Sequence, residues 1–331
     1  MITRRSALAA IAGIGVAGIT GCSRSDSRRL YASDHHSADY PTVVAVNAMG
    51  KSLFEKTDGR LDIKTYPGGQ LGSERDTLEI TVFGGLDINR VNAAPLNSLA
   101  PMTVVPCLPF LFEDEAHLHR SLDGEPGKFV LDSLQDHGLV GLCYYESGMR
   151  SFYNTKKPIR SPDDMKGMKV RVQNSDVYVS MINALGADAT PMYLGEVYSS
   201  LVQGVIDGAE NNWPSYQAGR HFEVARYYSL TRHVMAPEVL VMSQHRWRSL
   251  SDADKEAVMS SAKESVGIMR TLWRERVLQA QKLVIDSGVE INEVDNIAEF
   301  SSLMKPLWER IASSNKQQEL IEQILELRGQ S

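Results

Sequence analysis

The amino-acid sequence predicts an α/β fold with two lobes and a long bracing helix near the C-terminus. Apolar residues switch repeatedly between helical and strand spacing over the first two thirds of the chain, as in β/α units. Serine caps and glycine stops separate these segments where helices are expected to begin and end. The pattern from 251 to 287 stays helical without a breaker, and a helix of that length can brace two lobes.

The first β/α units are expected between residues 41 and 92. The expected elements are a helix over 41–57, a strand over 60–66, a helix from 73 to 84 and a strand over 86–92. Pro41 suits a first helical turn, where a backbone N–H has no partner. Ser73 followed by Asp76 predicts an N-cap, and Gly84 predicts the end of that helix.

The β/α alternation resumes after a proline-rich crossing between residues 101 and 109. The expected elements are a polar helix over 113–138, strands over 139–144 and 169–172, helices from 161, 175 and 195, and a strand over 205–209. The run 139–144 is too apolar to face water. We therefore expect it in the centre of a sheet, covered on both faces.

The N-terminus predicts a signal peptide over 1–21. Arg4 and Arg5 precede an apolar stretch from Ala7 to Ile19, which is shorter than the roughly 20 residues that a spanning helix needs. The arginine pair resembles a twin-arginine export signal, although Ala7 stands where an aromatic residue is more common. General export is the alternative route.

The end of this leader predicts lipid anchoring at Cys22. The run Ile19-Thr20-Gly21-Cys22 resembles a bacterial lipobox, in which the cysteine thiol takes a diacylglyceryl group. An ordinary cleavage site with an incidental cysteine is the alternative. Residues 22–29 form a short polar tether, as a lipid-anchored domain requires. We expect an exported, periplasmic protein that meets a membrane only through this anchor.

Composition excludes several classes of protein. The chain of 331 residues has a formal net charge of −6 and no basic block, which argues against nucleic-acid binding. Cys107 and Cys143 lie in apolar contexts, so buried free thiols are expected rather than a disulfide. The length fits one large domain or two medium ones.

No motif predicts a cofactor, a metal or an enzyme. The Gly-x-Gly-x-x-Gly match over 13–18 lies inside the leader, and the sequence has no Walker loop, HExxH or Gly-x-Ser-x-Gly. His117 and His119 form the only close histidine pair with one intervening residue. On a charged helix, this pair is expected to be solvent-exposed.

Three polar positions stand out in the middle of the chain. Arg171 lies between Val170 and Val172, so strand alternation points it away from the two valines. Arg150 follows the apolar run 139–144, and Asn211 follows the strand expected over 205–209. Each residue taken alone would more often be an ordinary surface or ion-paired residue.

Their shared position favours a binding site. All three follow the ends of successive expected strands, where open α/β sheets place their ligand crevice. Two guanidiniums and an amide suit a carboxylate, because the planar arginine fork makes two parallel charge-assisted hydrogen bonds.

Several motifs resemble those of the DctP-like substrate-binding subunits of TRAP transporters, closest to the members that bind hexuronates. The motifs are Arg150-Ser-Phe-Tyr-Asn, Asp164-Met-Lys-Gly-Met-Lys-Val-Arg171-Val, Pro191-Met192, Gly195-Glu-Val-Tyr198, Asp207-Gly-Ala-Glu-Asn211 and Pro67-Gly-Gly-Gln-Leu-Gly-Ser-Glu74. The resemblance extends from about residue 30 to 325. It implies a two-lobed periplasmic solute-binding fold with hinge strands, and a receptor that delivers a small organic acid to membrane subunits.

The resemblance also implies a division of roles among the site residues. Arg171 matches the arginine that binds the ligand carboxylate, Arg150 its supporting arginine, and Asn211 an orienting amide. The implied contacts from the first lobe, and two further flanking positions, are Glu74, Asn92, His36, Arg90 and Gln173. Leu194 departs from relatives that place an aromatic residue against the ligand.

Two of these residues have plain structural alternatives. Glu74 also reads as a capping partner or a surface acid on the Ser73 helix. His36 also reads as an exposed loop histidine, although the first strand of the family delivers a contact at this pair.

The expected organisation has five parts. They are a signal peptide over 1–21, a lipid-anchored tether over 22–29, mainly lobe 1 over 30–145, mainly lobe 2 over 146–240, and C-terminal helices bridging both lobes over 241–331.

The expected ligand is a sugar acid, D-glucuronate or D-galacturonate. A second carboxylate beside Glu74 would be repelled in a closed cleft, which favours a monoacid that carries hydroxyls. The stretch from Glu210 to Tyr216 also resembles relatives that bind hexuronates. The alternatives are a receptor for C4-dicarboxylates or other small acids, a ligand sensor for a signalling partner, and an exported enzyme using Glu74 and a histidine.

Overall fold

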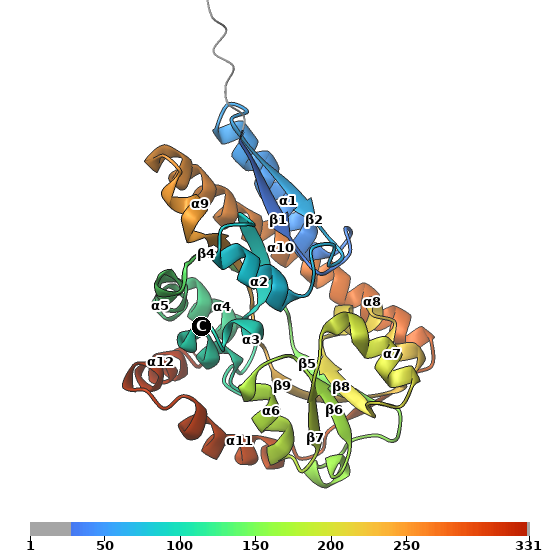
Figure 1. Cartoon of the computed structure of the whole chain (residues 1–331). Helices are drawn as coiled ribbons and strands as arrows, with labels where there is room; N and C mark the ends of the chain where they lie inside the picture. Colours follow the sequence, from blue (N-terminus) through green and yellow to red (C-terminus); the bar gives the residue numbers. More distant parts are fainter. Residues whose placement is uncertain (1–27, 330–331) are drawn as a thin grey trace, which may run out of the picture.

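The structure is a computed structural model that describes residues 28–329, so the leader and Cys22 lie outside the described residues. Two sheets lie one beyond the other, each with its own helices (Figure 1). We use lobe 1 for the five-stranded sheet with its helices and lobe 2 for the six-stranded sheet with its helices. The two-lobed α/β fold expected from the sequence is confirmed.

Lobe 1 is built on a mixed sheet with the strand order β2-β1-β3-β10-β4. Its strands are β1 (Arg28–Ser33), β2 (Leu61–Tyr66), β3 (Ile88–Asn92), β4 (Leu139–Tyr145) and β10 (Glu238–Ser243). Its helices are α1 (Pro41–Lys56), α2 (Glu74–Val82), α3 (Ala93–Leu96), α4 (Glu115–Asp123), α5 (Glu125–Ser133) and α9 (Gln244–Arg248). β10 comes from far along the chain and pairs antiparallel with both β3 and β4.

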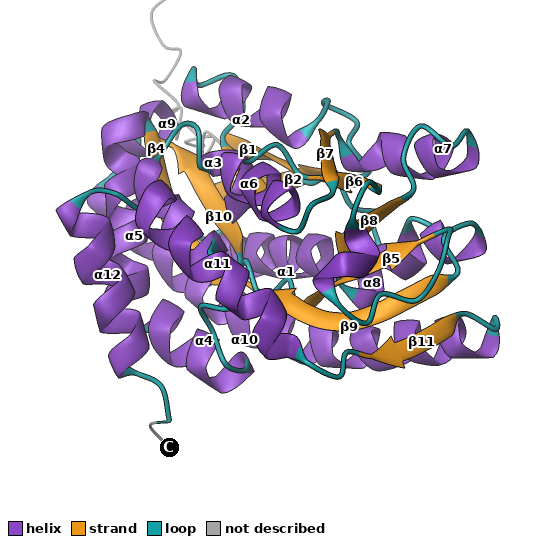
Figure 2. Cartoon of the chain, turned by 90° about the horizontal axis from the view of Figure 1, so that it is seen from below, coloured by secondary structure: helices purple, strands orange, loops and turns teal. Residues whose placement is uncertain are grey.

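Lobe 2 is built on a sheet with the strand order β11-β9-β5-β8-β6-β7. Its strands are β5 (Arg150–Asn154), β6 (Lys169–Val172), β7 (Asp188–Pro191), β8 (Gly208–Asn211), β9 (Tyr227–Val234) and β11 (Glu290–Glu293). Its helices are α6 (Asp176–Ala184), α7 (Val197–Val202), α8 (Trp213–Ala218) and α11 (Ile297–Ile311). Figure 2 shows helices on both sides of the strands.

Four segments join the lobes: the connections 146–149, 235–237 and 312–314, and the helix α10 (Asp252–Asp286). α10 is 35 residues long and packs on α1 and β4 in lobe 1 and on α8 in lobe 2. It runs behind both sheets in Figure 1. The last helix, α12 (Asn315–Glu326), returns to lobe 1.

Local chain signals explain the starts of these helices. Ser73 caps α2 through the reciprocal bonds with Asp76 that the sequence predicts, and Pro41 is the first residue of α1. The polar helix expected over 113–138 is wrong as one element, because α4 ends at Gly124 and α5 starts anew there. Pro126 stands in the first turn of α5, where its missing N–H costs nothing.

Two strand predictions also differ from the structure. The strand expected over 205–209 is shifted and forms β8 over 208–211. β4 is buried as expected but lies at the edge of its sheet, because β10 occupies the place beside it and helices α5 and α10 cover it. Apolar character thus predicted burial correctly and strand order wrongly.

Separate hydrophobic clusters fill the interior of the molecule. Cys107 and Cys143 are buried free thiols, as expected. Within residues 28–329 no helix has the length and apolar character needed to cross a bilayer.

Candidate functional site

The polar residues singled out in the sequence gather where the two sheets face each other. In lobe 1, Asp34 to His36 follow β1, and Asn92 ends β3. In lobe 2, Arg171 lies in β6 and Asn211 ends β8. Arg150 begins β5 rather than following a strand, but β5 is antiparallel to β8, so Arg150 and Asn211 still share one edge.

Two small cavities lie between the lobes at this junction. Glu74 from lobe 1 and Arg171 from lobe 2 line one of about 30 Å³, together with Gln173. His35 and His36 line an adjoining cavity of about 260 Å³. Tyr193 and Leu194, from lobe 2, line both.

Arg171 is a buried cation without a counter-ion. Its Nε and Nη2 donate to the Met192 carbonyl at 3.0 and 2.7 Å, and its buried Nη1 has no partner. Among residues 28–329 no acidic side chain forms an ion pair with it. Burial lowers the pKa of Arg171, because the loss of water outweighs the attraction of Glu210 and Glu74, neither of which pairs with it. This arrangement favours an anion at Nη1.

Arg150 has its counter-ion within the protein. Its Nη2 donates to Glu210 Oε1 at 2.8 Å and to the Glu210 carbonyl at 2.9 Å, while Nη1 donates to Asn211 Oδ1 at 2.9 Å. Burial alone would raise the pKa of Glu210, but Arg150 outweighs burial and holds it at about 2. Arg150 therefore fixes the position of Asn211. Nothing in the local sequence indicates Glu210 as the partner of Arg150, because the pairing joins residues 60 apart.

Arg90 is the centre of a larger network in lobe 1. Its side chain is fully buried and forms ion pairs with Asp34, Glu74 at 3.0 Å and Glu238 at 2.6 Å. His35 Nδ1 lies 2.9 Å from its Nη2. Four residues thus surround the guanidinium, and they come from three separate segments of the chain.

Glu74 is held in this network from three sides. Its Oε1 accepts from Arg90 and, at 2.9 Å, from the backbone N–H of Asn92, and it lies 3.1 Å from His35 Nδ1. Burial would raise the pKa of Glu74, but His35 and Arg90 together lower it. The capping alternative is excluded, because Asp76 and not Glu74 makes the reciprocal cap bonds.

The two adjacent histidines have different surroundings. His36 is buried and stacks on the Tyr40 ring with centroids 3.6 Å apart, and burial lowers the pKa of His36. It is therefore not an exposed loop residue. The buried Nε2 of His35 has no partner, and its ring faces Tyr193 edge-on at 6.4 Å across the junction.

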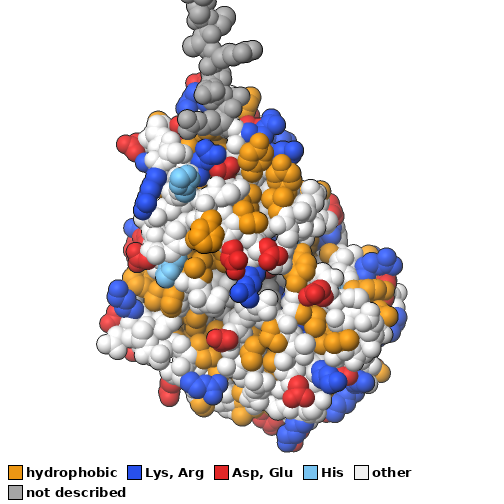
Figure 3. Space-filling view, in the orientation of Figure 1, with side chains coloured by type: hydrophobic (Ala, Val, Ile, Leu, Met, Phe, Trp, Pro, Cys, Tyr) orange, Lys and Arg blue, Asp and Glu red, His pale blue; other side chains and the backbone are white. Residues whose placement is uncertain are grey.

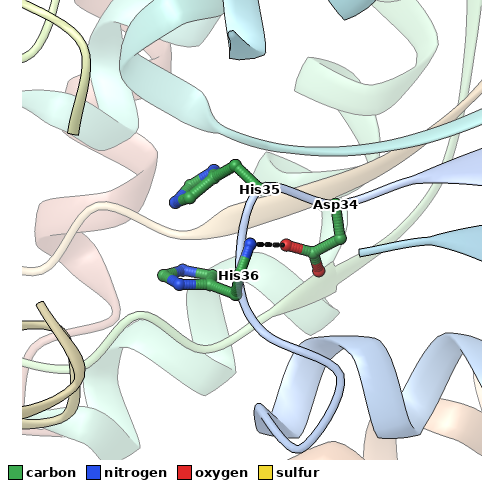
Figure 4. Close-up of side chains that lie close together, drawn as sticks. All are labelled: Asp34, His35 and His36. Atoms are coloured by element: carbon green, nitrogen blue, oxygen red, sulfur yellow. Dashed lines mark hydrogen bonds between the residues drawn. The ribbon is translucent and has the colours of Figure 1, made fainter. Parts of the chain in front are cut away.

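Asp34, His35 and His36 bring three potential metal-ligand atoms within 4.8 Å of one another. Figure 4 shows both imidazoles extending to one side of the chain and the Asp34 carboxylate to the other. The carboxylate already accepts from Arg90 and from Thr42 at 2.6 Å. A guanidinium in contact with the carboxylate disfavours a cation there.

The remaining predicted residues also lie at the junction. Asn92 caps α3 through Oδ1, and its Nδ2 lies 3.3 Å from Glu238 Oε1. Asn211 Oδ1 accepts from Arg150 and from the Asn212 N–H. The Oε1 atom of Gln173 is buried without a partner.

Direct contacts between the lobes show that the cleft is closed. Tyr40 of lobe 1 and Ser215 of lobe 2 share a hydrogen bond of 3.1 Å. Ser175 donates to Asn97 Oδ1 at 2.6 Å. Figure 3 shows acidic and basic side chains side by side on the face where the lobes meet.

Known proteins resemble this chain over most of its length. A family model described as bacterial extracellular solute-binding protein, family 7, matches residues 32–315. A solute-binding protein of Chromohalobacter salexigens is 42% identical over 86% of this chain and 84% of its own. The 2,3-diketo-L-gulonate-binding periplasmic protein of Escherichia coli is 32% identical over 75% of this chain and 76% of its own.

Solved structures extend the likeness to the whole fold. A TRAP periplasmic solute-binding protein from Bradyrhizobium, in complex with D-galacturonate, has a TM-score of 0.89 and 48% identity, covering 90% of this chain and 100% of that one. One from Chromohalobacter salexigens with bound D-glucuronate has a TM-score of 0.88 and 40% identity, with coverage of 90% and 100%.

Proposed function

This chain belongs to the bacterial extracellular solute-binding proteins of family 7, the receptors of TRAP transporters, and we propose that its ligand is a hexuronate, D-galacturonate or D-glucuronate. One observation carries the proposal. Arg171 is buried at the lobe junction without an acidic partner among the described residues, and its Nη1 is unpaired. A ligand carboxylate supplies the missing charge through charge-assisted hydrogen bonds.

The wall opposite Arg171 favours hydroxyl groups on the rest of the ligand. In lobe 1, Asp34, Glu74 and Glu238 bring three carboxylates against the single guanidinium of Arg90. A second ligand carboxylate would meet like charge in a closed, water-poor cleft. Sugar hydroxyls, in contrast, can donate hydrogen bonds to these carboxylates. The acidic wall therefore favours a hydroxylated monoacid over a C4-dicarboxylate.

We assign the site residues as follows. Arg171 binds the acid, and Arg150 and Asn211 orient it. From lobe 1, Glu74, Asn92 and His36 form hydrogen bonds with the ligand hydroxyls. Gln173 lies next to the ligand carboxylate. Arg90 acts indirectly, because it holds Glu74 in position. Several neighbours of similar fold were solved with glucuronate or galacturonate bound, which supports a hexuronate as the ligand of these residues.

We further propose an exported receptor that is anchored in a membrane through a lipidated Cys22. Relatives described as periplasmic support the compartment, and the lipobox-like run before Cys22 supports the anchor. The partners are the membrane subunits of a TRAP transporter. Lobe 1, mainly residues 30–145, and lobe 2, mainly residues 146–240, would close on the ligand about the connections 146–149 and 235–237, and the C-terminal helices of 241–331 bridge both lobes.

A thermal-shift panel tests the ligand assignment. Hexuronates, aldonates, C4-dicarboxylates and 2-oxoacids are compared on the same protein, since a bound ligand raises the unfolding temperature according to its concentration over Kd. We expect stabilisation by glucuronate or galacturonate. Stabilisation by succinate or malate, with no effect of either uronate, would overturn the assignment.

A further inference from the structure

The five strands of lobe 1 have two ends with different character. The strands β1, β2 and β3 are parallel, so all three begin at the same end. We call the surface formed by these strand ends, which is distinct from the outermost strands, the entry edge. β4 also begins there and β10 ends there. The segments at the entry edge are the start of β1 and the connections 57–60, 83–87, 134–138 and 243–251. Figure 1 shows β1 beginning at the end of lobe 1 farthest from lobe 2.

The ligand residues of lobe 1 lie at the opposite edge. Asp34 follows the end of β1, Asn92 ends β3, and Glu238 begins the antiparallel β10. A strand of five to seven residues, at about 3.3 Å per residue, separates the two edges by roughly 20 Å. The entry edge is therefore outside the ligand-binding machinery.

The entry edge carries the most exposed large hydrophobic side chain of the described residues. Phe83 is 87% exposed and follows the last residue of α2. Gly84 follows with φ of +82°, which turns the chain sharply and leaves the ring at the tip of the connection. Ile80, one turn earlier on the same helix, is 39% exposed. Phe83 and Ile80 together present an apolar surface at this edge that suits contact with another apolar medium.

Three arginines at the entry edge form ion pairs. Arg29 pairs with Asp62 at 3.0 Å. Arg60 pairs with Asp254 at 2.7 Å, and Arg246 with Asp87 at 2.5 Å. Arg248 and Asp58, also at this edge, form no ion pair within residues 28–329, so charges of both signs remain beside these pairs.

The chain itself limits what can cover this edge. Six residue steps separate Cys22 from Arg28, the first residue of β1, and they span at most roughly 20 Å when fully extended. With lipid on Cys22, the entry edge cannot move farther than that from the headgroups.

We propose that the entry edge rests on the lipid surface that holds Cys22, with Phe83 inserted among the headgroups. The inference depends on the proposed lipid anchor and is independent of the hexuronate assignment. The contact is mainly apolar, because the exposed ring of Phe83 is the inserted group and three nearby arginines are already paired. The ligand-binding edge of lobe 1 then points away from the lipid.

A fluorescent probe at position 83 tests the orientation. Lipidated protein carrying Phe83→Cys is labelled with a polarity-sensitive dye and reconstituted into phosphatidylcholine vesicles. Val202→Cys is the matched control, because Val202 is 58% exposed on α7 in lobe 2. Cys107 and Cys143 are buried and do not compete for the label. Amide exchange of 80–86 in unlabelled protein, with and without vesicles, checks the result without altering Phe83.

We expect the probe at position 83 to brighten several-fold and to be quenched by nitroxide-bearing lipid, while the probe at 202 stays water-like. Amides 80–86 should be protected only on vesicles, and most of this protection should remain at high salt. A water-like probe at 83 overturns the inference, as does brightening that requires the membrane subunits or occurs at 202 instead. A protein that fails to float with vesicles refutes the anchor and the inference together, whereas hexuronate stabilisation of the same sample still tests the ligand assignment separately.

Discussion

The two lobes place their buried arginines in opposite electrostatic surroundings. In lobe 1, Arg90 faces three carboxylates, from Asp34, Glu74 and Glu238. The guanidinium is over-compensated there, and the wall as a whole is acidic. Such an arginine serves the protein itself, since it holds the carboxylates in place.

Lobe 2 shows the reverse balance. Arg150 pairs with Glu210, whereas Arg171 pairs with no acid among the described residues, so two guanidiniums face one carboxylate. The difference teaches that burial alone does not identify a ligand-binding arginine. What identifies it is a buried charge whose counter-ion the fold does not supply.

Removing the buried cation of lobe 1 should have the largest effect on the stability of the protein. Arg90→Met leaves three buried carboxylates without their common cation, and removing one member of a buried pair costs about 3–5 kcal/mol. We expect a lower free energy of unfolding, measured by urea denaturation without ligand. Arg29→Met, in an exposed pair on the same sheet, should remain close to wild type. Equal stability of both variants would contradict the over-compensated picture of lobe 1.

Removing the free cation of lobe 2 should affect binding more than folding. Arg171→Ala should weaken hexuronate binding by about 2–5 kcal/mol, or roughly thirtyfold to a few thousandfold in Kd by calorimetry. Arg171→Lys should restore part of this, because lysine keeps the charge but lacks the two parallel donors. Lys169→Ala, on the exposed end of the same strand, is the control. Wild-type affinity in Arg171→Ala would remove Arg171 from its proposed role.

Changing a lobe 1 residue that contacts the ligand hydroxyls should alter the selectivity among acids and leave binding of the carboxylate intact. Glu74→Gln keeps the size of the side chain but removes an acceptor charge, so hexuronate affinity should fall by roughly tenfold. Simple short acids should bind the variant and the wild type alike. Glu79→Gln, exposed on the same helix, is the control. A uniform loss over all acids would mean that both lobes contact the carboxylate.

The smallest effect is expected from a direct hydrogen bond between the lobes that does not involve the ligand. Tyr40→Phe removes the hydrogen bond to Ser215, a bond worth about 0.5–1.5 kcal/mol. Ligand release should become about two- to tenfold faster in stopped-flow experiments, since only the closed state loses a contact. Tyr31→Phe, half exposed on β1, should release ligand at the wild-type rate. Unchanged release in Tyr40→Phe would show that this contact does not hold the cleft shut.

Local chain signals predicted much of the fold and part of the candidate site. Alternation around Val170 and Val172 marked Arg171 as the unusual residue of a buried strand, and the structure buries all three. Ser73 with Asp76 located the start of α2, and the unbroken pattern over 251–287 contains α10. These signals depend on neighbours within about one helical turn or on strand alternation, which the sequence displays directly.

Contacts between residues far apart in the chain could not be predicted from the sequence. The partners of Arg90 lie 16, 56 and 148 residues away in the chain, so nothing in its local sequence indicates three carboxylates. The same holds for the edge position of β4, which depends on the arrival of β10 beside it. The unpaired Nε2 of His35 was missed for a related reason, because only the fold shows which of two adjacent histidines is stacked.

The interior place of β10 has a consequence for the order of assembly. The first sheet cannot close until residue 243 has been synthesised, because β10 lies between β3 and β4. A nascent chain of about 150 residues would present two unsatisfied strand edges, which invite aggregation. Lobe 1 is thus completed by sequence that comes after most of lobe 2. A truncated lobe 1 should fail as an isolated fragment, and the chain should commit to its native topology late, as one cooperative unit.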